Sequence, residues 1–324
     1  MNRRQFLGFT AGAVTGAVRA ADDAPVLDFR GLVEEGRRFL EEELPADWLE
    51  QLPEADEEKI RDLLQRIEAG LAGDYVVDLA ALRDGARTLL PLLDTFPESR
   101  PYSDWLRSRM DYFDVAEELR VRVGAPPSPP PVPRSTNAPP ALPPARPVPT
   151  LEVEREVWRR RIERRPEPAG AAALARQLRP VFTGNGVPGA LVWVAEVESS
   201  FKPEARSPAG AVGLFQLMPA TAKAMGLSLA PRDERLVPRR NAEGAARYLR
   251  YLFNRFRDWP LTLAAYNAGE GRVNGLLRET RGRRFEDIRR RLPAETQMYV
   301  PKVDAVLQRR EGVALARLPA VRQG

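Results

Sequence analysis

The 324-residue chain contains no cysteine and no histidine. These two absences exclude a cysteine nucleophile, a Ser-His-Asp triad, a disulfide framework and metal sites built from Cys or His ligands. We therefore expect no cofactor and no metal centre. Any catalysis has to rely on carboxylates, hydroxyls, Lys, Arg or backbone amides.

Long apolar runs are also missing, since no segment approaches the 18 uninterrupted apolar residues typical of a membrane-spanning helix. Residues 1–20 combine early arginines, a moderately apolar stretch and a small-residue end, which is the pattern of a signal peptide. Arg3-Arg4-Gln5-Phe6-Leu7 resembles a twin-arginine export signal, and an ordinary Sec signal is the alternative. We expect export to the periplasm and no stable membrane anchor.

Charge is unevenly divided along the chain, although the net charge is only +5. Residues 21–125 carry 26 acidic and 13 basic side chains, a net of −13, and residues 126–324 carry 19 acidic and 34 basic, a net of +15. A basic half is compatible with nucleic acid or with another anionic polymer. Because 46 of the 50 basic residues are Arg in an Ala- and Pro-rich chain, base composition explains the bias equally well, and we expect no nucleic-acid partner.

The chain is predicted to be mainly α, with a separate all-helical N-terminal domain and a proline-rich linker. Apolar residues recur at helical spacing in the N-terminal region, whereas 12 of the 24 residues between 126 and 149 are proline. The predicted segments are a signal peptide at 1–20, an acidic helical domain at 21–125, a linker at 126–150, a helical lead-in at 151–180, a compact domain at 181–312 and a tail at 313–324.

The N-terminal domain offers two functional hypotheses. Its negative charge permits contact with the positive remainder of the chain, so residues 21–125 are a candidate partner-docking module for a cell-wall protein, or an inhibitory module. The aromatic-rich stretch Tyr102–Phe113 is either a ligand surface or an amphipathic helix that packs its aromatics. Helical periodicity favours packing.

A buried helix with two acidic residues is predicted within Val187–Phe201. At 100° per residue, Glu198 falls within about 20° of Leu191 on the helical wheel, and Glu196 lies about 140° from it. Both sides of the wheel are apolar, so the pattern favours Glu198 without proving it. A carboxyl on an apolar face is desolvated and tends to be protonated, as a general acid for glycoside cleavage requires. The alternative is a Glu paired with one of the many Arg residues.

A glycine-containing turn follows in Ser207–Ala222. Gly210 and Gly213, three residues apart, permit a tight turn and close approach of the backbone to a ligand. Gln216 is a polar side chain among apolar neighbours, suited to orienting a polar group of a substrate. Pro219 then suits the first turn of a helix.

Two further segments place polar side chains near helix ends. In Leu263–Val273 a helix is predicted to end at Tyr266-Asn267 and to open into a Gly-x-Gly loop. The Tyr-Asn pair either hydrogen-bonds into a cleft or caps and packs. In Leu292–Lys302, helical spacing puts Glu295 and Tyr299 on one face.

In their order and spacing, these four segments resemble the soluble lytic transglycosylase (SLT) domain of glycoside hydrolase family 23. The resemblance covers about residues 181–312 and is greatest to the membrane-bound lytic murein transglycosylase D branch. It implies a lysozyme-like α+β fold with very little strand. The matching runs are Glu-Ser at 198–199, Ser-Pro-Ala-Gly-Ala-Val-Gly-Leu-Phe-Gln-Leu-Met-Pro at 207–219, Ala-Tyr-Asn-Ala-Gly at 265–269 and Glu-Thr-x-x-Tyr-Val at 295–300.

The resemblance implies non-hydrolytic cleavage of the β-1,4 bond between N-acetylmuramic acid and N-acetylglucosamine in peptidoglycan glycan strands. One Glu acts first as acid and then as base, leaving a 1,6-anhydromuramyl product, and by position it is Glu198. The substrate's acetamido group is thought to stabilise the cationic centre, so no second carboxylate is needed. By position, the substrate-binding residues are Ser199, the lining pair Gln216 and Met218, Tyr266 as support for the catalytic Glu with Asn267 beside it, and Glu295 near the bound peptide.

Two departures from the D branch are expected, namely the lack of C-terminal LysM repeats and the lack of a lipid anchor, which requires cysteine. Two other functions stay open. One is a hydrolytic goose-type lysozyme on the same fold, and the other is a non-catalytic peptidoglycan-binding protein.

Overall fold

The computed structural model describes residues 57–95, 99–125 and 147–322, and these residues are mainly helical. Within these ranges β-structure is limited to two isolated antiparallel bridges, Arg206–Val212 and Val212–Leu217. The prediction of a mainly α chain is confirmed. The predicted signal peptide (1–20) and all but the last four residues of the predicted linker (126–150) lie outside the described residues.

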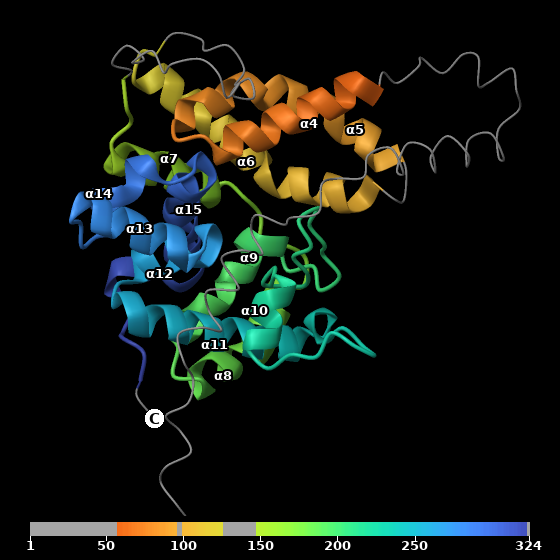
Figure 1. Cartoon of the computed structure of the whole chain (residues 1–324), viewed down its shortest axis with the longest axis vertical. Coiled ribbons are helices and arrows are strands. Elements are labelled where there is room, and N and C mark those ends of the chain that lie inside the picture. The colour runs from red at the N-terminus through yellow and green to blue at the C-terminus, as the bar shows by residue number, and fades with distance from the viewer. Residues whose placement is uncertain (1–56, 96–98, 126–146, 323–324) are drawn as a thin grey trace, which may run out of the picture.

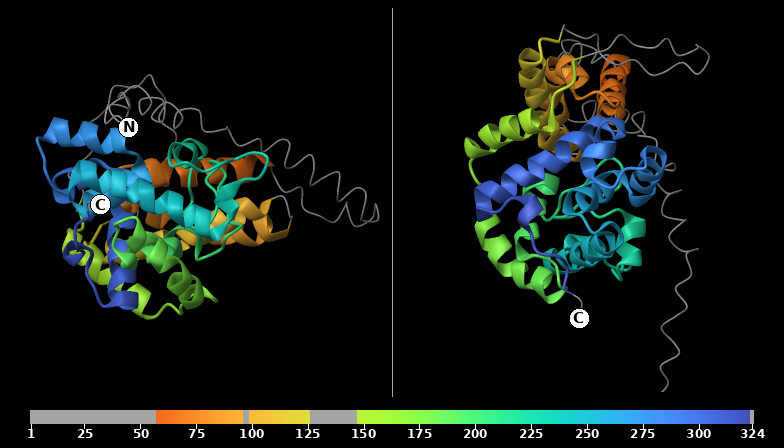
Figure 2. Two further views of the ribbon diagram at one scale, coloured as in Figure 1. Left: turned by 90° about the horizontal axis from the view of Figure 1, so that it is seen from below. Right: turned by 90° about the vertical axis from the view of Figure 1, so that its left-hand side faces the viewer.

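Among the described residues before 126, three helices and a 3₁₀ segment form the N-terminal group, orange to yellow at one end of the molecule in Figure 1 and in the right-hand view of Figure 2. Apolar residues at helical spacing bury one face of the first helix, with Leu64, Ile67 and Leu71 each no more than 3% exposed. The 3₁₀ segment packs against all three helices. The elements are α4 (Glu57–Ala72), η1 (Val76–Leu82), α5 (Arg83–Thr95) and α6 (Arg100–Arg122).

Helix α7 (Leu151–Glu163) begins directly after the proline-rich segment. Thr150 caps it, because its Oγ1 accepts a hydrogen bond from the Val153 amide. The apolar stripe that includes Trp158 and Ile162 is fully buried. The predicted helical lead-in therefore has an ordinary amphipathic basis, and it continues into α8 (Ala171–Gly184).

The remaining elements are short helices and turns arranged around two longer helices. Short segments follow from the many Gly and Pro residues, which end or begin helices. These elements are η3 (Gly189–Trp193), α9 (Val194–Ser199), α10 (Pro219–Ala224), η4 (Glu234–Leu236), α11 (Pro238–Phe256), α12 (Trp259–Ala268), α13 (Glu270–Thr280), α14 (Phe285–Ile288), η5 (Arg289–Arg291), α15 (Ala294–Glu311) and η6 (Leu315–Arg317).

Helix α15 lies at the centre of the molecule. All residues of its middle, Thr296–Leu307, are buried. It packs against α7 and α12, against η3 and α9 beside the site, and against α4 and η1 of the N-terminal group. The buried apolar residues of all these elements form one continuous cluster. The helices of the N-terminal group pack mainly on one another and also contact α7 and α15, so their apolar residues belong to the same cluster.

Ion pairs join the acidic N-terminal region to the basic remainder. Asp111 on α6 accepts from Arg161 at 3.2 Å and from Arg165 at 2.7 Å, and Asp104 pairs with Lys202 at 2.6 Å. The opposite charges of the two regions thus meet within one molecule. No helix among the described residues has the length and apolarity needed to cross a membrane.

Candidate active site

Glu198 lies in the last turn of α9, where the chain turns sharply. The two residues that follow, Ser200 and Phe201, have φ angles of 52° and 60°. A left-handed conformation is unfavourable for residues other than glycine, so surrounding contacts have to hold these two in place. Phe201 is buried with its ring 5.4 Å from that of Trp193. Such local strain concentrates at functional sites, and here it ends the helix next to a carboxyl that faces a pocket.

The side chain of Glu198 is half-buried in the pocket wall, and its carboxyl group accepts a hydrogen bond from a tyrosine. Tyr299 Oη on α15 donates to Glu198 Oε1 at 2.5 Å. Burial raises the pKa of Glu198 to about 7, and it outweighs the hydrogen bond from Tyr299 and the positive charge of Arg109, which lower it. A Glu with this pKa exchanges a proton near neutral pH, as an acid that later acts as a base requires.

Glu196, two residues earlier, has a structural role. Its carboxylate is buried and accepts two hydrogen bonds from Arg310, from Nε at 2.9 Å and from Nη2 at 3.1 Å. These two hydrogen bonds fasten α9 to the end of α15. The sequence left two interpretations open for an acidic residue on this segment, a desolvated acid or a Glu paired with Arg. Glu196 is the residue that is paired with Arg.

The buried segment before Glu198 differs from the predicted regular helix. It consists of the 3₁₀ turn η3 followed by the six-residue α9. A wheel drawn at 100° per residue therefore does not describe the whole segment, since a 3₁₀ turn advances more per residue. The preference for Glu198 rested on Leu191, which belongs to the 3₁₀ part.

Loop 207–218 is fastened to its neighbours by buried hydrogen bonds. Asn241 Oδ1 accepts from the Phe215 amide at 2.8 Å, and Ser199 Oγ donates to the Leu214 carbonyl at 2.8 Å. Gly213 has φ 87°, and a Cβ there would lie 2.1 Å from the Arg235 carbonyl oxygen. The close approach at Gly213 is to the protein's own backbone, whereas the sequence suggested a ligand.

Gln216 lines the pocket beside Glu198. Its Nε2 donates to the carbonyl oxygens of Ala205 (3.1 Å) and Gly213 (2.8 Å), so the amide is held by its own loop. Its φ is 46°, another left-handed residue in the wall of the site. The predicted Gln216 thus stands where a substrate group would be oriented, with its nitrogen already in use.

The other predicted site residues lie behind or beside the pocket. Tyr266 Oη donates to the Phe215 carbonyl at 2.7 Å and not to Glu198, although the two are close enough for the Glu198 carboxylate to help raise the pKa of Tyr266, second to burial. Asn267 Oδ1 accepts from Thr296 at 2.7 Å. Met218, half-buried before α10, is not among the described residues that line the pocket.

A single glycine separates the helix that carries Tyr266 from the next one. Gly269 (φ 87°) follows α12, and Glu270 already begins α13. The predicted Gly-x-Gly loop is therefore wrong, because Gly271 lies within α13. Glu295, which the resemblance places near the bound peptide, pairs with Arg109 of α6 at 2.7 Å.

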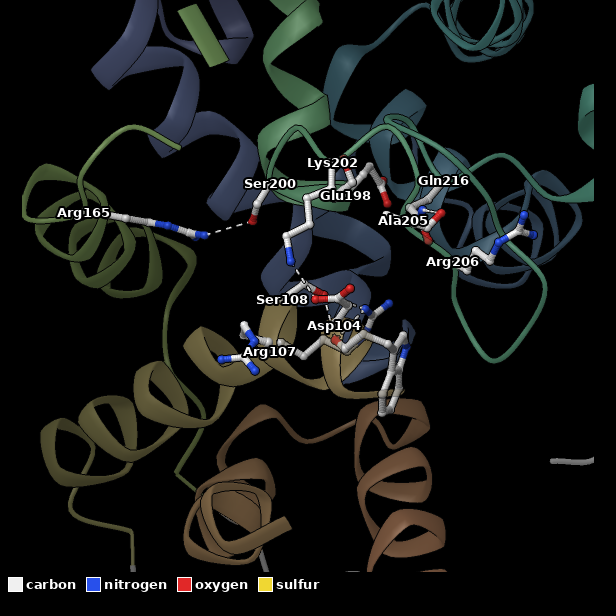
Figure 3. A pocket seen from close by; sticks show the side chains of 13 residues that line it. Asp104, Arg107, Ser108, Arg165, Glu198, Ser200, Lys202, Ala205, Arg206 and Gln216 are labelled. Atoms are coloured by element: carbon white, nitrogen blue, oxygen red, sulfur yellow. Dashed lines mark hydrogen bonds and ion pairs between the residues drawn. The ribbon is translucent and has the colours of Figure 1, made fainter. Parts of the chain in front are cut away.

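Helix α6 forms the wall opposite Glu198, and sequence reasoning missed it. Figure 3 shows Glu198, Lys202 and Gln216 on one side of the pocket and Asp104, Arg107 and Ser108 on the other. The pocket holds about 180 Å³. Its lining consists of Asp104, Trp105, Arg107, Ser108, Arg109, Arg165, Glu198, Ser199, Ser200, Lys202, Ala205, Arg206 and Gln216. The aromatic-rich stretch 102–113 contained the signal, since part of it supplies this wall.

Lys302 and Tyr299 are two further groups that the site predictions left out. Lys302 Nζ is buried beside the Tyr112 ring, 4.6 Å from its centroid, and donates to the Ser108 carbonyl at 3.1 Å. Burial lowers the pKa of Lys302 to about 8. In the sequence, the feature that could have pointed to Lys302 is its place one helical turn after Tyr299, in the run Tyr-Val-Pro-Lys at 299–302. The described residues contain no group of three acidic side chains arranged to hold a metal ion.

Comparison with known proteins assigns the region around Glu198. Residues 183–288 match the family model described as "Transglycosylase SLT domain". This part of the chain is similar to a transglycosylase SLT domain. The match includes α9, the loop with Gln216 and the helix with Tyr266, whereas helix α6 and the Glu295–Tyr299 segment lie outside it.

Two curated relatives share this region. Membrane-bound lytic murein transglycosylase D of Escherichia coli K12 is 38% identical over 126 residues, which are 38% of this chain and 28% of the relative. Soluble lytic murein transglycosylase of Salmonella typhimurium is 38% identical over 96 residues, 28% of this chain and 15% of the relative. The chain thus spans less than a third of the length of these relatives.

Among solved structures, an inactive mutant of lytic transglycosylase Slt from Pseudomonas aeruginosa is 35% identical. The similarity covers 43% of this chain and 23% of that one, with a TM-score of 0.37.

Proposed function

We propose that this protein is a peptidoglycan lytic transglycosylase. It cleaves the β-1,4 bond between N-acetylmuramic acid and N-acetylglucosamine without water and leaves a 1,6-anhydromuramyl end. The single observation that carries the proposal is Glu198, a half-buried carboxyl with a pKa raised to about 7, set in the wall of a pocket within the SLT-like region.

Glu198 serves both halves of the reaction. The protonated carboxyl gives its proton to the glycosidic oxygen as the bond from the muramyl C1 to that oxygen breaks. The Glu198 carboxylate then takes the proton of the muramyl 6-hydroxyl while the oxygen of that hydroxyl bonds to C1. The proton lost in the first half is regained in the second, so no water is consumed. The substrate's own acetamido oxygen stabilises the positive charge that develops at C1.

The acidic residues around the pocket favour a mechanism in which Glu198 is the single catalytic carboxyl group. The other acidic residue among the described residues that line the pocket is Asp104, and it is engaged with Lys202 at 2.6 Å. A hydrolase of this kind uses a second carboxylate to activate water or to attack the sugar. With its charge compensated across the pocket, Asp104 is poorly suited to that task.

The proposal extends to where the protein acts. The signal-like residues 1–20 and the peptidoglycan substrate agree on a periplasmic protein. The partner is the glycan strand itself. Whether the N-terminal region also docks a cell-wall protein is a separate hypothesis, based on charge alone.

The test is mass spectrometry of purified peptidoglycan digested by the wild-type protein and by Glu198→Gln. We expect anhydromuramyl products from the wild type and a loss of at least 10³-fold with Glu198→Gln, which can neither give nor take the proton. Glu204→Gln, which removes an exposed carboxylate six residues away, is the matched control and should keep full activity.

Other outcomes separate the alternatives. Reducing-end muramyl sugars would show a lysozyme and would contradict the non-hydrolytic mechanism. Binding of glycan with no products from the wild type would show a non-catalytic wall-binding protein. Equal activity of wild type and Glu198→Gln would remove Glu198 from the reaction.

A further inference from the structure

An aromatic side chain of α6 stands at the pocket without any assigned role. Trp105 is half-buried and lines the pocket with its neighbours Asp104, Ser108 and Arg109. Helix α6 lies outside the residues that match the SLT model. The chain therefore adds a wall of its own to the pocket.

Packing in the core accounts fully for Tyr112 and Phe113 of this helix, whereas Trp105 packs against the core with only part of its side chain and also lines the pocket. Tyr112 and Phe113, at the far end of the stretch, are buried, and the Tyr112 ring meets that of Trp158 edge-on at 5.6 Å. Trp105 lies two turns earlier on the same stripe as Tyr112, where the stripe leaves the interior and reaches the pocket. The apolar face of α6 thus ends in an indole that faces the site.

Arg109 holds the indole in place. Its guanidinium carbon lies 4.8 Å from the centroid of the Trp105 ring, and Nη1 donates to the Trp105 carbonyl at 3.3 Å. Glu295 fixes the same guanidinium from α15 at 2.7 Å. Because the ring is positioned before a ligand arrives, binding costs little side-chain entropy.

We propose that Trp105 is a stacking surface for a sugar ring of the glycan, forming a subsite beside Glu198 that α6 contributes. A pyranose ring has an apolar C–H face and a polar rim, and an indole plane surrounded by polar groups matches both. The Ser108 hydroxyl and the Asp104–Lys202 pair supply the polar surroundings. The proposal rests on the proposed function, because the ligand is the same glycan strand.

The test combines kinetics with binding. Product release from purified peptidoglycan is measured over a range of substrate concentrations for wild type, Trp105→Ala, Trp105→Phe and Tyr102→Ala. We expect Trp105→Ala to raise KM about tenfold with kcat within twofold, which corresponds to the loss of one aromatic contact. Trp105→Phe keeps a ring and should stay near wild type. Tyr102→Ala alters an aromatic residue of the same helix that does not line the pocket, and its KM and kcat should also stay near the wild-type values.

Binding to peptide-free glycan strands is measured in parallel in the Glu198→Gln background, with and without Trp105→Ala. A tenfold weaker binding with Trp105→Ala supports the subsite and assigns it to sugar rather than to peptide. Unchanged KM and unchanged binding would overturn it, and so would a fall in kcat alone, which is the mark of a purely structural residue. If the wild type gave no anhydromuramyl product while binding still depended on Trp105, the proposed catalysis would fail and the subsite would stand.

Discussion

Two tyrosines approach Glu198, and only one of them donates a hydrogen bond to it. Tyr299 comes from α15 and donates to the carboxyl, whereas Tyr266 comes from α12 and donates to the backbone of the neighbouring loop. Tyr299 is therefore the positioning residue of the acid. Tyr266 supports Glu198 only indirectly, because its hydroxyl fixes the neighbouring loop at Phe215.

Replacing Tyr299 should shift the pH dependence of activity. The hydrogen bond favours the ionised form of Glu198, so Tyr299→Phe raises the pKa of Glu198 further above its present value of about 7. Because the first step needs the protonated acid, the fall of kcat on the alkaline side should move up by about one pH unit. The measurement is kcat from pH 5 to pH 9.

Tyr266→Phe is the matched control, because it removes one hydroxyl of the same kind nearby. It should leave the alkaline limb where it is and change activity through the loop alone. An alkaline limb that moved with Tyr266→Phe, and stayed in place with Tyr299→Phe, would reverse the two roles.

The sequence predicted some residues of this site but not the roles of others. Glu198, Ser199 and Gln216 were placed by local pattern together with motif resemblance, and all three line one pocket. Tyr299 was placed on the correct face but given no role, because the partner of a hydroxyl depends on how α15 docks against α9. These two residues are 101 positions apart in the chain, and no local periodicity carries that information.

At the scale of elements, short α9 is held by its contacts rather than by its own helical stability. A six-residue helix is far below the length that is stable in isolation. The Glu196–Arg310 ion pair joins it to α15, and η3 joins it to the core. The position of Glu198 therefore depends on a pair that takes no part in the chemistry.

Breaking that pair should destabilise the protein strongly. Glu196→Gln leaves Arg310 buried without its counter-charge, at a cost of about 3–5 kcal/mol, which corresponds to a fall in Tm of about 10 °C. Glu163→Gln, which breaks the exposed pair with Arg159, is the control and should leave Tm nearly unchanged. Thermal unfolding followed by circular dichroism gives both values, and equal Tm values for the two variants would show that the ion pair does not hold α9.

Element boundaries show where local signals compete. The segment before Glu198 begins as a 3₁₀ turn, which the sequence does not distinguish from regular helix because apolar residues lie on all sides of it. The glycines at 269 and 271 predict a loop because glycine disfavours helix, yet only Gly269 leaves the helical conformation. Burial of Val273 in the core outweighs the low helix propensity of Gly271, and the segment is therefore helical.

For the whole molecule, the N-terminal helices are part of the core and part of the site. The composition of residues 126–149 predicted a boundary between domains, and the opposite charges on its two sides predicted contact across it. The structure contains that contact, with α6 and α7 joined by ion pairs from Arg161 and by buried apolar residues. Linear sequence did not show that α6 would reach the pocket, because that requires α15 to lie between the two regions.

Removing the N-terminal region should abolish both folding and activity. A chain of residues 147–324 exposes the apolar surfaces of α7 and α15 that α4, η1 and α6 now cover, and it lacks one wall of the pocket. We expect no cooperative thermal transition and no product from peptidoglycan, in contrast to the full chain measured alongside. A cooperative transition with retained activity and unchanged salt dependence would show that residues 21–125 neither complete nor regulate the site.

The central position of α15 has a consequence for the order in which the protein matures. The pocket needs Arg109 to meet Glu295 and Ser108 to meet Lys302, contacts that span 186 and 194 residues of chain. Contacts of such long range cannot form on a growing chain until α15 has been made. A chain that stops before Tyr299 lacks the hydrogen bond to Glu198, and it therefore lacks a positioned acid.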